Sequence, residues 1–531
     1  MNIILPDVLL ILRKSISLIS ALIIISLFVS CTNKKDKKPD SAITVQDNNI
    51  TTQYEQHIKT PELQTDLKLI GQLKTKKSNE INGSQWGVCC HWIVDPHDLT
   101  TDQQVEQLAW LGAKYGFLCS DWDKVEAKKG KYNFNTPTHK FDDAVFGMAK
   151  RGIEPVIQIY GGNRLYMPYA LDVNNRQMAD ADKLLNDQET RKAWIAYLKA
   201  MVTRYKDHVK AWEIWNEPNS DYFWQKDGKR FEPSVEIYGS VLKLAAEAIR
   251  SVQPDAIIIA GSTAHVKKEY LKGFLNSEGG DYYDFWSIHP YGEVPEAYDP
   301  KIIEVQEILK EFGKTSVMWQ SECGFPSDGN TGGWGWAGPW DETKQAKWVL
   351  RRFLSDAKVG LKPSIYFCLN DYPTMLEFGP DAGKMGNNAK GLFTNKTWKP
   401  KISAYAFRNL SAVIDNKLEQ KSLKISFKTS IDSTSAHLRS YTLKEKSTGS
   451  PVIVYWLDIP METNFATQKI QISLEEDKID QPVLVDLLDG HVYDVLMDKE
   501  GQKVFKELPI TDSPLVLCSR SLIELVPKDG Q

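Results

Sequence analysis

Strand-like and helix-like segments alternate along most of this chain, and this alternation limits its fold more than any other feature. From about residue 84 to residue 412, eight short apolar segments are each followed by a helix-like one. The pattern is typical of a parallel sheet with crossover helices, and eight such pairs close a (β/α)8 TIM barrel. The predicted strands are 86–92, 115–119, 154–160, 211–215, 256–260, 285–289, 316–321 and 364–369.

A doubly wound open sheet is the structural alternative to a barrel. Its usual cofactor needs a glycine-rich turn after an early strand, and we find no such turn in the sequence. The chain has 531 residues, whereas single cores stop growing near about 250–300 residues. We therefore expect the barrel to occupy residues 81–415. The segments within 416–531 are short, β-rich and separated by turn residues, and they predict an antiparallel β-sandwich as an accessory domain.

The N-terminal residues resemble an export signal, and we expect them to lie outside the folded domains. Two basic residues, Arg13 and Lys14, precede a short apolar run over 15–30, which is the pattern of a secretion signal. The run ends in LFVSC, which resembles a bacterial lipobox with the lipid on Cys31. We expect a lipoprotein signal peptide over 1–30, then a flexible tether and N-terminal extension over 31–80. A plain cleaved signal and an uncleaved anchor are the alternatives.

These features predict an exported bacterial lipoprotein that is held at the outer membrane through Cys31, on its periplasmic or its surface face. The formal net charge is −4, with acidic and basic residues well mixed. Because there is no basic stripe, we expect no nucleic-acid partner. The remaining six cysteines form no CxxC motif and no cluster with metal-ligand spacing. Most of them lie in or beside apolar segments, which favours free thiols over disulfides.

The clearest candidate for a chemical role is Glu217, which follows the fourth predicted strand. The segment AWEIWNEPN (211–219) is a short apolar strand that ends in Asn216, Glu217 and Pro218. Proline has no backbone N–H and cannot continue regular strand pairing. Glu217 is therefore expected at the carboxyl end of its strand, which is where barrel enzymes build their sites. The alternative is a turn on a surface loop.

Glu322 is the second carboxylate that follows a predicted barrel strand. The segment VMWQSECGF (317–325) is again apolar and ends in Glu322, after which Gly324 lets the chain leave the strand. Alone, this pattern also fits a structural glutamate. As the seventh strand beside Asn216 and Glu217 on the fourth, it predicts two carboxylates that converge across the mouth of the barrel.

This arrangement resembles clan A of the glycoside hydrolases, the retaining (β/α)8-barrel glycosidases. Within the clan, WEIWNEPN (212–219), HPYG (289–292) and the trailing β-domain are most similar to glycoside hydrolase family 39. The resemblance implies that Glu217 is the general acid/base, Glu322 the nucleophile and Asn216 a ligand of the sugar 2-hydroxyl. It also implies that His289 and Tyr291 contact the substrate and the nucleophile.

The stretch after the second strand shows one agreement with the family and one departure from it. Asp121 and Trp122 lie in a segment that is similar to the family's stretch there, and they are candidates for substrate binding. Relatives in the clan often carry an arginine near the end of this strand, facing the nucleophile. That position holds Phe117 here. We expect either a different branch of the clan or electrostatic support from another residue.

Other candidate substrate contacts are aromatic and polar residues near strand ends. The chain has 16 tryptophans, which would form either a large aromatic core or platforms on which sugar rings stack. A glycine-rich loop after the seventh strand carries three of them, Trp334, Trp336 and Trp340, and its composition is typical of a mobile flap. The candidates at other strand ends are His91, Trp92, Tyr160 and Asn370.

The resemblance implies a retaining glycosidase that acts on β-linked oligo- or polysaccharides, in an exo (β-xylosidase-like) or an endo mode. Two carboxylates are sufficient for this chemistry, so we expect no metal and no cofactor. The alternatives are a transglycosylase that uses the same pair and a non-catalytic glycan-binding protein on a decayed barrel. The β-sandwich would then be a carbohydrate-binding module or a passive support. The sequence predicts neither the sugar nor the oligomeric state.

Overall fold

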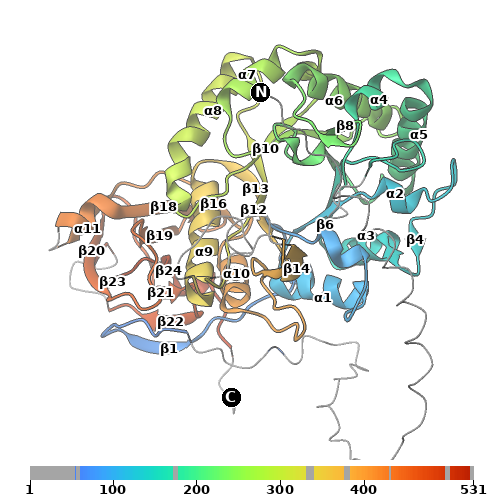
Figure 1. Ribbon diagram of the computed structural model, residues 1–531. Coiled ribbons are helices and arrows are strands. Elements are labelled where there is room, and N and C mark those ends of the chain that lie inside the picture. Colours follow the sequence, from blue (N-terminus) through green and yellow to red (C-terminus); the bar gives the residue numbers. More distant parts are fainter. Residues whose placement is uncertain are drawn as a thin grey trace, which may run out of the picture. The chain divides into compact units, whose positions relative to one another are not determined.

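A closed barrel of eight parallel strands forms the larger part of the fold in the computed structural model of this chain (Figure 1). The structure describes residue 54 and residues 60–170, 177–329, 340–375, 383–429, 432–496 and 503–526. Each barrel strand pairs in parallel with its neighbours, and β13 pairs with β2 to close the ring. The strands are β2 (Trp86–Cys89), β3 (Tyr115–Cys119), β6 (Glu154–Ile159), β7 (Ala211–Ile214), β10 (Ile257–Ala264), β11 (Phe285–His289), β12 (Met318–Cys323) and β13 (Leu361–Phe367).

The predicted TIM barrel is therefore confirmed, and all eight predicted strands overlap observed ones. At the fifth strand β10 continues to Ala264, and at the seventh strand β12 continues to Cys323 and takes Glu322 into the strand itself. Helices cover the outside of the barrel (Figure 1). They are α1 (Thr101–Leu111), α2 (Trp122–Val125), α3 (Phe141–Lys150), α4 (Ala181–Asn186), α5 (Gln188–Tyr205), α6 (Val235–Arg250), α7 (Lys268–Leu275), α8 (Asp299–Glu311), α9 (Glu342–Lys358) and α10 (Ile402–Val413).

Local sequence signals account for where these helices begin and end. Thr100 caps α1, because its side chain accepts a hydrogen bond from the backbone N–H of Gln103. Gly112 ends the helix in a left-handed conformation that glycine adopts without steric cost. The next strand, β3, begins at Tyr115. A cap at one end and a glycine at the other thus fix how α1 delivers the chain into the barrel.

Side chains from strands around the ring fill the interior of the barrel. The buried cluster contains Cys89, Phe117, Ala211 and Trp319, and such layers make a TIM barrel a packed core with no pore. Phe117, which stands where clan relatives often have an arginine, is fully buried in this cluster. Short elements in the loops complete the barrel domain. They are η2 (Ser78–Glu80), η3 (His91–Val94), β4 (Asn135–Thr136), β5 (His139–Lys140), η4 (Asp221–Phe223), β8 (Gln225–Lys226), β9 (Lys229–Arg230), η5 (Glu278–Asp281), η6 (Pro295–Tyr298), β14 (Tyr372–Met375) and β15 (Met385–Asn388).

The residues after the barrel form two antiparallel sheets, as predicted for the β-sandwich. A seven-stranded sheet has the order β1-β22-β21-β24-β19-β18-β16, and a three-stranded sheet has the order β17-β20-β23. The outermost strand, β1 (Lys68–Gln72), comes from before the barrel and pairs with β22. The other strands and the two short helices of this domain are β16 (Leu418–Gln420), β17 (Ile425–Thr429), α11 (Asp432–His437), β18 (Leu438–Glu445), β19 (Pro451–Leu457), β20 (Gln468–Leu474), β21 (Pro482–Asp486), β22 (His491–Asp494), β23 (Val504–Ile510), β24 (Leu515–Ser519) and η7 (Arg520–Leu522).

Buried charged groups join the sandwich to the barrel. Arg351 of α9 donates two hydrogen bonds of 2.8 Å to the carboxylate of Glu296 in η6. Trp456 of β19 donates its indole N–H to the same carboxylate at 2.7 Å. Lys347 of α9 pairs with Asp512 at 2.7 Å. Because buried charges are tolerated only when they are paired and hydrogen-bonded, these contacts fix the sandwich against η6 and α9 of the barrel domain.

The predicted signal peptide and the lipidated Cys31 lie outside the described residues. Within the part of the chain that the structure describes, no helix is long and apolar enough to span a bilayer. The six cysteines from Cys89 to Cys518 are all buried free thiols, in line with the expectation from their apolar surroundings.

Candidate active site

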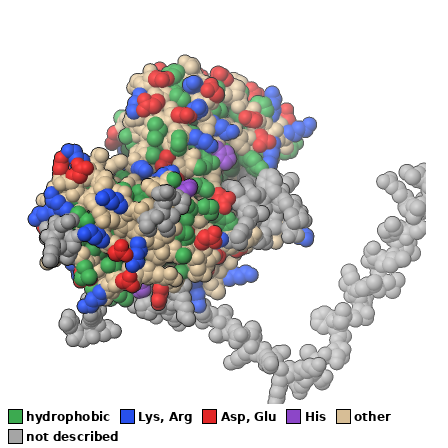
Figure 2. Space-filling view, turned by 90° about the vertical axis from the view of Figure 1, so that its left-hand side faces the viewer, with side chains coloured by type: hydrophobic (Ala, Val, Ile, Leu, Met, Phe, Trp, Pro, Cys, Tyr) green, Lys and Arg blue, Asp and Glu red, His purple; other side chains and the backbone are tan. Residues whose placement is uncertain are grey.

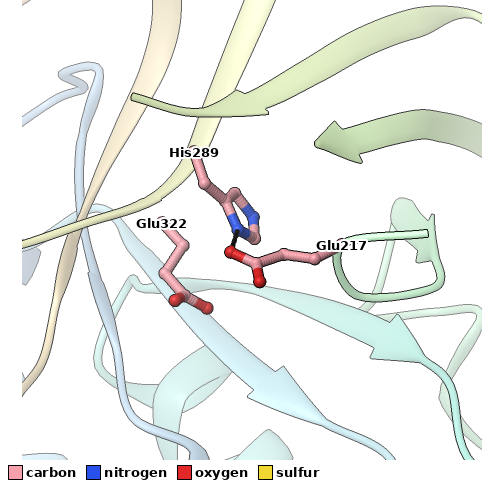
Figure 3. Close-up of side chains that lie close together, drawn as sticks. All are labelled: Glu217, His289 and Glu322. Atoms are coloured by element: carbon pink, nitrogen blue, oxygen red, sulfur yellow. Dashed lines mark hydrogen bonds and ion pairs between the residues drawn. The ribbon is translucent and has the colours of Figure 1, made fainter. Parts of the chain in front are cut away.

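Two glutamates from separate strands meet at the carboxyl end of the barrel (Figure 3). Glu217 follows β7, and Glu322 lies near the end of β12, three strands further round the ring. An oxygen of each carboxylate and a ring nitrogen of His289 all lie within 4.8 Å of one another. Retaining glycosidases separate their carboxyl groups by about 5–5.5 Å, and inverting ones by about 6.5–9.5 Å. The spacing therefore fits the retaining geometry.

The turn that carries Glu217 has an unusual backbone. Glu217 has a φ of 43°, in the left-handed region that costs most residues roughly 1–2 kcal/mol. The turn is held because the Glu217 N–H donates to the carbonyl of Ser262 at 3.1 Å. Asn219 also exchanges side-chain hydrogen bonds with the backbone of Ala264 at the end of β10. The strain aims the Glu217 side chain into the mouth of the barrel, and β10 stabilises it.

His289 links Glu217 to the barrel wall. Its Nδ1 lies 3.1 Å from Oε1 of Glu217, and its Nε2 lies 3.1 Å from the hydroxyl of Ser321. Burial alone would lower the pKa of His289, but the charges of Glu322 and Glu217 and the hydrogen bond to Glu217 raise it to about 9. A doubly protonated ring donates from both nitrogens. The charged imidazolium thus lies beside both carboxylates.

Glu322 is held more tightly than Glu217. The hydroxyl of Tyr291 donates to its Oε1 at 2.7 Å, and the backbone carbonyl of Tyr291 accepts a hydrogen bond from Tyr298 in η6. Burial raises the pKa of Glu322, and the negative charge of Glu217 raises it further, whereas the charge of His289 and the Tyr291 hydrogen bond oppose these effects. The environment therefore contains groups that stabilise the ionised form in spite of burial.

Asn216 is oriented by a buried network behind it. The amide of Gln158 donates to Oδ1 of Asn216 at 3.0 Å and to Oε1 of Glu213 at 2.8 Å. Burial raises the pKa of Glu213, which favours its protonated form. Since Oδ1 of Asn216 is occupied from behind, its NH₂ group is directed toward the cavity that Asn216 lines. This donor is suited to a hydroxyl beside the reacting carbon.

The two glutamates open into a cavity of about 1100 Å³. Aromatic side chains form its walls: the rings of Trp92 and Tyr372 lie 4.0 Å apart, and Tyr160 and Phe223 meet edge to face at 5.5 Å. Trp92 is 36% exposed, which is high for a tryptophan. Flat apolar faces beside carboxylates and hydroxyls suit a sugar, whose rings have apolar C–H faces and polar edges. The space-filling view shows charged and apolar side chains interspersed over the surface (Figure 2).

Several predicted substrate contacts do line this cavity, namely His91, Trp92, Asp121, Tyr160, Asn216 and Tyr291. His289 is completely buried behind Glu217. It is therefore placed to act through the carboxylates, whereas the resemblance implied direct contact with the substrate.

Three predicted contacts are wrong. Trp122 is buried against Tyr166 and Tyr197 and donates to Glu126, so it supports α2 from behind the cleft. Asn370 points toward Gln104 of α1. Trp340 packs on Phe325 at 4.1 Å, as part of the core. In each case a strand end or a loop is near the site, but the side chain turns away from it. Trp334 and Trp336 lie outside the described residues.

Lys390 lies in the cavity but is not among the site residues that the sequence predicts. It follows the β14–β15 hairpin, lines the cavity together with both glutamates, and is 4% exposed. Nothing local identifies it, because a lysine beside a glycine in a loop is ordinarily solvated. The other cationic side chains of the cavity, Lys124 and Arg164, form ion pairs with aspartates at its rim.

Among the described residues, Glu217, His289 and Glu322 form the group that could hold a metal ion. Two carboxylates with a protonated imidazole beside them are equally what acid–base chemistry requires. The expectation that no metal and no cofactor is needed stays a prediction.

The comparison with known families agrees with this geometry. A model of the glycosyl hydrolases family 39 matches residues 104–323, a range that runs from α1 to the end of β12 and contains both glutamates. This confirms the predicted resemblance to family 39 and the predicted enzyme class, a glycosidase that hydrolyses O-glycosyl compounds.

Solved structures show the same fold. A family 39 glycoside hydrolase from the gut symbiont Bacteroides cellulosilyticus WH2 is 19% identical, with a TM-score of 0.60 over 84% of this chain and 83% of the other. A family 39 β-xylosidase from Caulobacter crescentus is 15% identical, with a TM-score of 0.53 over 88% of this chain and 100% of the other. The family 39 enzyme from Xanthomonas axonopodis pv. citri is 14% identical, with a TM-score of 0.53 over 88% and 98%.

Proposed function

We propose that this glycosidase cleaves β-linked glycans with retention of configuration, by double displacement through a covalent glycosyl-enzyme intermediate. The observation that carries the proposal is the close approach of the Glu217 and Glu322 carboxylates, whose oxygens lie within 4.8 Å. That spacing leaves no room for the water molecule that an inverting enzyme places between its carboxyl group and the sugar.

In the first step, a carboxylate oxygen of Glu322 attacks the anomeric carbon while protonated Glu217 gives its proton to the departing glycosidic oxygen. The C–O bond to the leaving group breaks as the bond to Glu322 forms. In the second step, ionised Glu217 removes a proton from water, which attacks the same carbon and releases Glu322. Two inversions restore the original configuration.

The surroundings suit this division of roles. Glu322 must begin ionised, and Tyr291 donates a hydrogen bond to it. Glu217 must gain and lose a proton in each cycle, and it is the less buried carboxylate, with its side chain 19% exposed at the cavity. A leaving group and then a water molecule can reach it from the solvent side. Asn216 directs its NH₂ group into the cavity, where a 2-hydroxyl would accept a bond that strengthens in the transition state.

Proton NMR during hydrolysis of an aryl β-glycoside tests the proposal. Retention predicts that the β-anomer of the released sugar forms first and then mutarotates, whereas a first-formed α-anomer would refute the mechanism. Aryl β-xyloside is a rational first substrate, because a structural neighbour is described as a β-xylosidase. The length of products from a xylo-oligosaccharide distinguishes exo from endo action, and products longer than the substrate would favour a transglycosylase. Binding of glycans without any turnover would favour the decayed-barrel alternative.

We also propose that the enzyme is tethered to a membrane through lipid on Cys31, which rests on the lipobox-like segment that ends there. Phase partition in a cloud-point detergent tests this. The full-length protein expressed in a Gram-negative host should enter the detergent phase, and Cys31→Ala should not. An unchanged distribution would contradict the anchor.

A further inference from the structure

Lys390 occupies a position that the fold specifies closely. Its backbone carbonyl accepts a hydrogen bond from the hydroxyl of Tyr366 at 2.7 Å. On either side, Ala389 accepts from Lys401 at 3.2 Å, and the N–H of Gly391 donates to Asp371 at 2.8 Å. These bonds come from β13, the start of α10 and the strand-end loop. Lys390 is therefore presented by an anchored backbone, which makes its place in the cavity a property of the fold.

The side chain of Lys390 runs beside the nucleophile. Its Cδ lies 3.5 Å from the point where a Cβ at Gly324 would stand, two residues after Glu322. Its ammonium lies 5.7 Å from the centre of the Tyr291 ring and 6.0 Å from that of Phe367. The Tyr291 hydroxyl in turn donates to Glu322 at 2.7 Å. The cation is thus packed against the same aromatic ring that contacts the nucleophile, and it shares one cavity with both carboxylates.

We propose that Lys390 is a positioning residue that keeps Glu322 ionised. It supplies the positive charge that an arginine on β3 would supply, since Phe117 stands at that position here. The proposal rests on the proposed role of Glu322 as nucleophile. It explains how a barrel can carry a phenylalanine where clan relatives often have an arginine. The cation enters from the segment after β13, the strand that neighbours β12 in the ring.

Electrostatics supports the role. Burial raises the pKa of Glu322, and the charge of His289, the hydrogen bond from Tyr291 and the charge of Lys390, in decreasing order, lower it. Burial also lowers the pKa of Lys390 itself, to about 8, while the charges of Glu322 and Glu217 oppose that change. Lys390 is therefore mainly protonated at pH 7 and below, where an ionised nucleophile most needs support.

Several other groups face this cation, and the test must separate their contributions. Their charges are of both signs, and the thiols among them are neutral when protonated. They are Glu217, Glu322, Cys323, Cys368 and Tyr291, with the Asp371–Lys401 pair next to Cys368.

The acidic limb of the pH dependence of kcat/KM is the measurement, because it reports the ionisation of the nucleophile in the free enzyme. Lys390→Met removes the charge at nearly constant length, and Lys390→Arg retains it. An aryl glycoside with a good leaving group should be used, because it depends little on Glu217 as an acid. Lys390→Met is expected to shift the limb upward by roughly one pH unit, which is about tenfold in kcat/KM at a pH below the limb. Lys390→Arg should restore the wild-type limb.

Lys243→Met is the matched control, since Lys243 of α6 forms a surface ion pair with Glu278 of η5 and its loss should leave the profile unchanged. Lys390→Gln gives a second neutral side chain if Lys390→Met does not fold. A limb that stays in place in both neutral variants, with only KM raised equally at every pH, would overturn the proposal and make Lys390 a substrate ligand.

A second readout is independent of turnover and separates this inference from the proposed function. Carbon-13 NMR of glutamate-labelled protein, with Glu322→Gln to assign the signal, follows the titration of the Glu322 carboxyl group. Lys390→Met should raise its apparent pKa whether or not any glycoside is hydrolysed. An unchanged titration would refute the electrostatic role, while a raised pKa in a protein that hydrolyses nothing would refute the proposed function alone.

Discussion

The two sides of the cleft hold their carboxylates in different ways. Glu322 lies inside β12, is 8% exposed and accepts a hydrogen bond from Tyr291. The backbone of Tyr291 is held by Tyr298 of η6, and η6 also carries Glu296, the residue that pairs with the sandwich. Glu217 lies beyond β7 on a left-handed turn, lines the cavity and is partly exposed.

This difference matches what each step requires. A nucleophile acts at one point in space and benefits from rigid supports, because a small misplacement can cost a large factor in rate. An acid/base exchanges protons with a leaving group and then with water, so it must remain accessible. The sandwich contacts the nucleophile's side of the cleft, since its Trp456 donates a hydrogen bond to Glu296 of η6.

Substitution of Glu322, the rigidly held carboxylate, should lower the rate most. Glu322→Ala removes the atom that forms the covalent bond, so kcat should fall by at least about 10⁴-fold, whatever the leaving group. Steady-state rates on aryl glycosides with good and poor leaving groups measure this, with the melting temperature as a control for folding. Hydrolysis near the wild-type rate would remove Glu322 from the mechanism.

Substitution of Glu217, the accessible carboxylate, should lower the rate by a factor that depends on the substrate. Glu217→Ala is expected to lower kcat/KM by about 10²–10⁴-fold on natural linkages, whose leaving oxygens need a proton. Formation of the intermediate from an aryl glycoside with a good leaving group should fall far less, because that group leaves as an anion. Pre-steady-state measurement of the aryl burst separates this step from the slow second one. An equal fall of that step for both substrates would contradict the role of Glu217.

Tyr291→Phe sharpens the comparison, because it loosens Glu322 without removing it. A hydrogen bond to a charged group is worth about 1.5–3 kcal/mol, so kcat/KM at acidic pH should fall roughly 10- to 100-fold and the acidic limb should move upward. Tyr298→Phe, which loses the hydroxyl contacts to the Tyr291 backbone and to Nδ1 of His265, should have a smaller effect. The pH profiles of kcat/KM for both variants measure this. Equal effects would contradict the account in which Tyr291 supports Glu322 directly and Tyr298 only through Tyr291.

The smallest effect is on the free energy of unfolding and its dependence on pH. It comes from His289, which lies beside both Glu217 and Glu322. Its pKa is raised from 6.5 to about 9 in the folded protein. The stability that its charge contributes is therefore fully present below about pH 6.5 and is lost as the pH rises through about 9. Denaturant unfolding at a series of pH values should show this decline in wild type and a flatter profile in His289→Asn. Parallel profiles would contradict the raised pKa.

The fold could be predicted from the sequence because its determinants are local. Each barrel strand is a short apolar run, and helix ends such as Thr100 and Gly112 carry their own signals. The two glutamates could be predicted for the same reason, since the end of a parallel strand fixes on which face of the barrel a side chain emerges.

The surroundings of the glutamates could not be predicted in this way, because they depend on which way loop side chains turn. Trp122 and Asn370 are close to strand ends, yet they pack away from the cleft. Lys390 lies 68 residues after Glu322 in the sequence and reaches the nucleophile only because β13, α10 and the intervening hairpin bring its backbone there. Phe117 indicated that a charge was needed but not where it would come from.

The most direct test of the account is to trap the covalent intermediate. A 2-deoxy-2-fluoro β-glycoside with a good leaving group should accumulate as a glycosyl-enzyme, because fluorine at C2 slows both steps while the good leaving group keeps the first one faster than the second. Mass spectrometry of the digested protein should then find the fluorosugar on the peptide that contains Glu322, and Lys390→Met should slow its formation at acidic pH. A label on the peptide of Glu217 would contradict the assignment of the nucleophile. Turnover with inversion and no adduct would contradict the retaining mechanism itself.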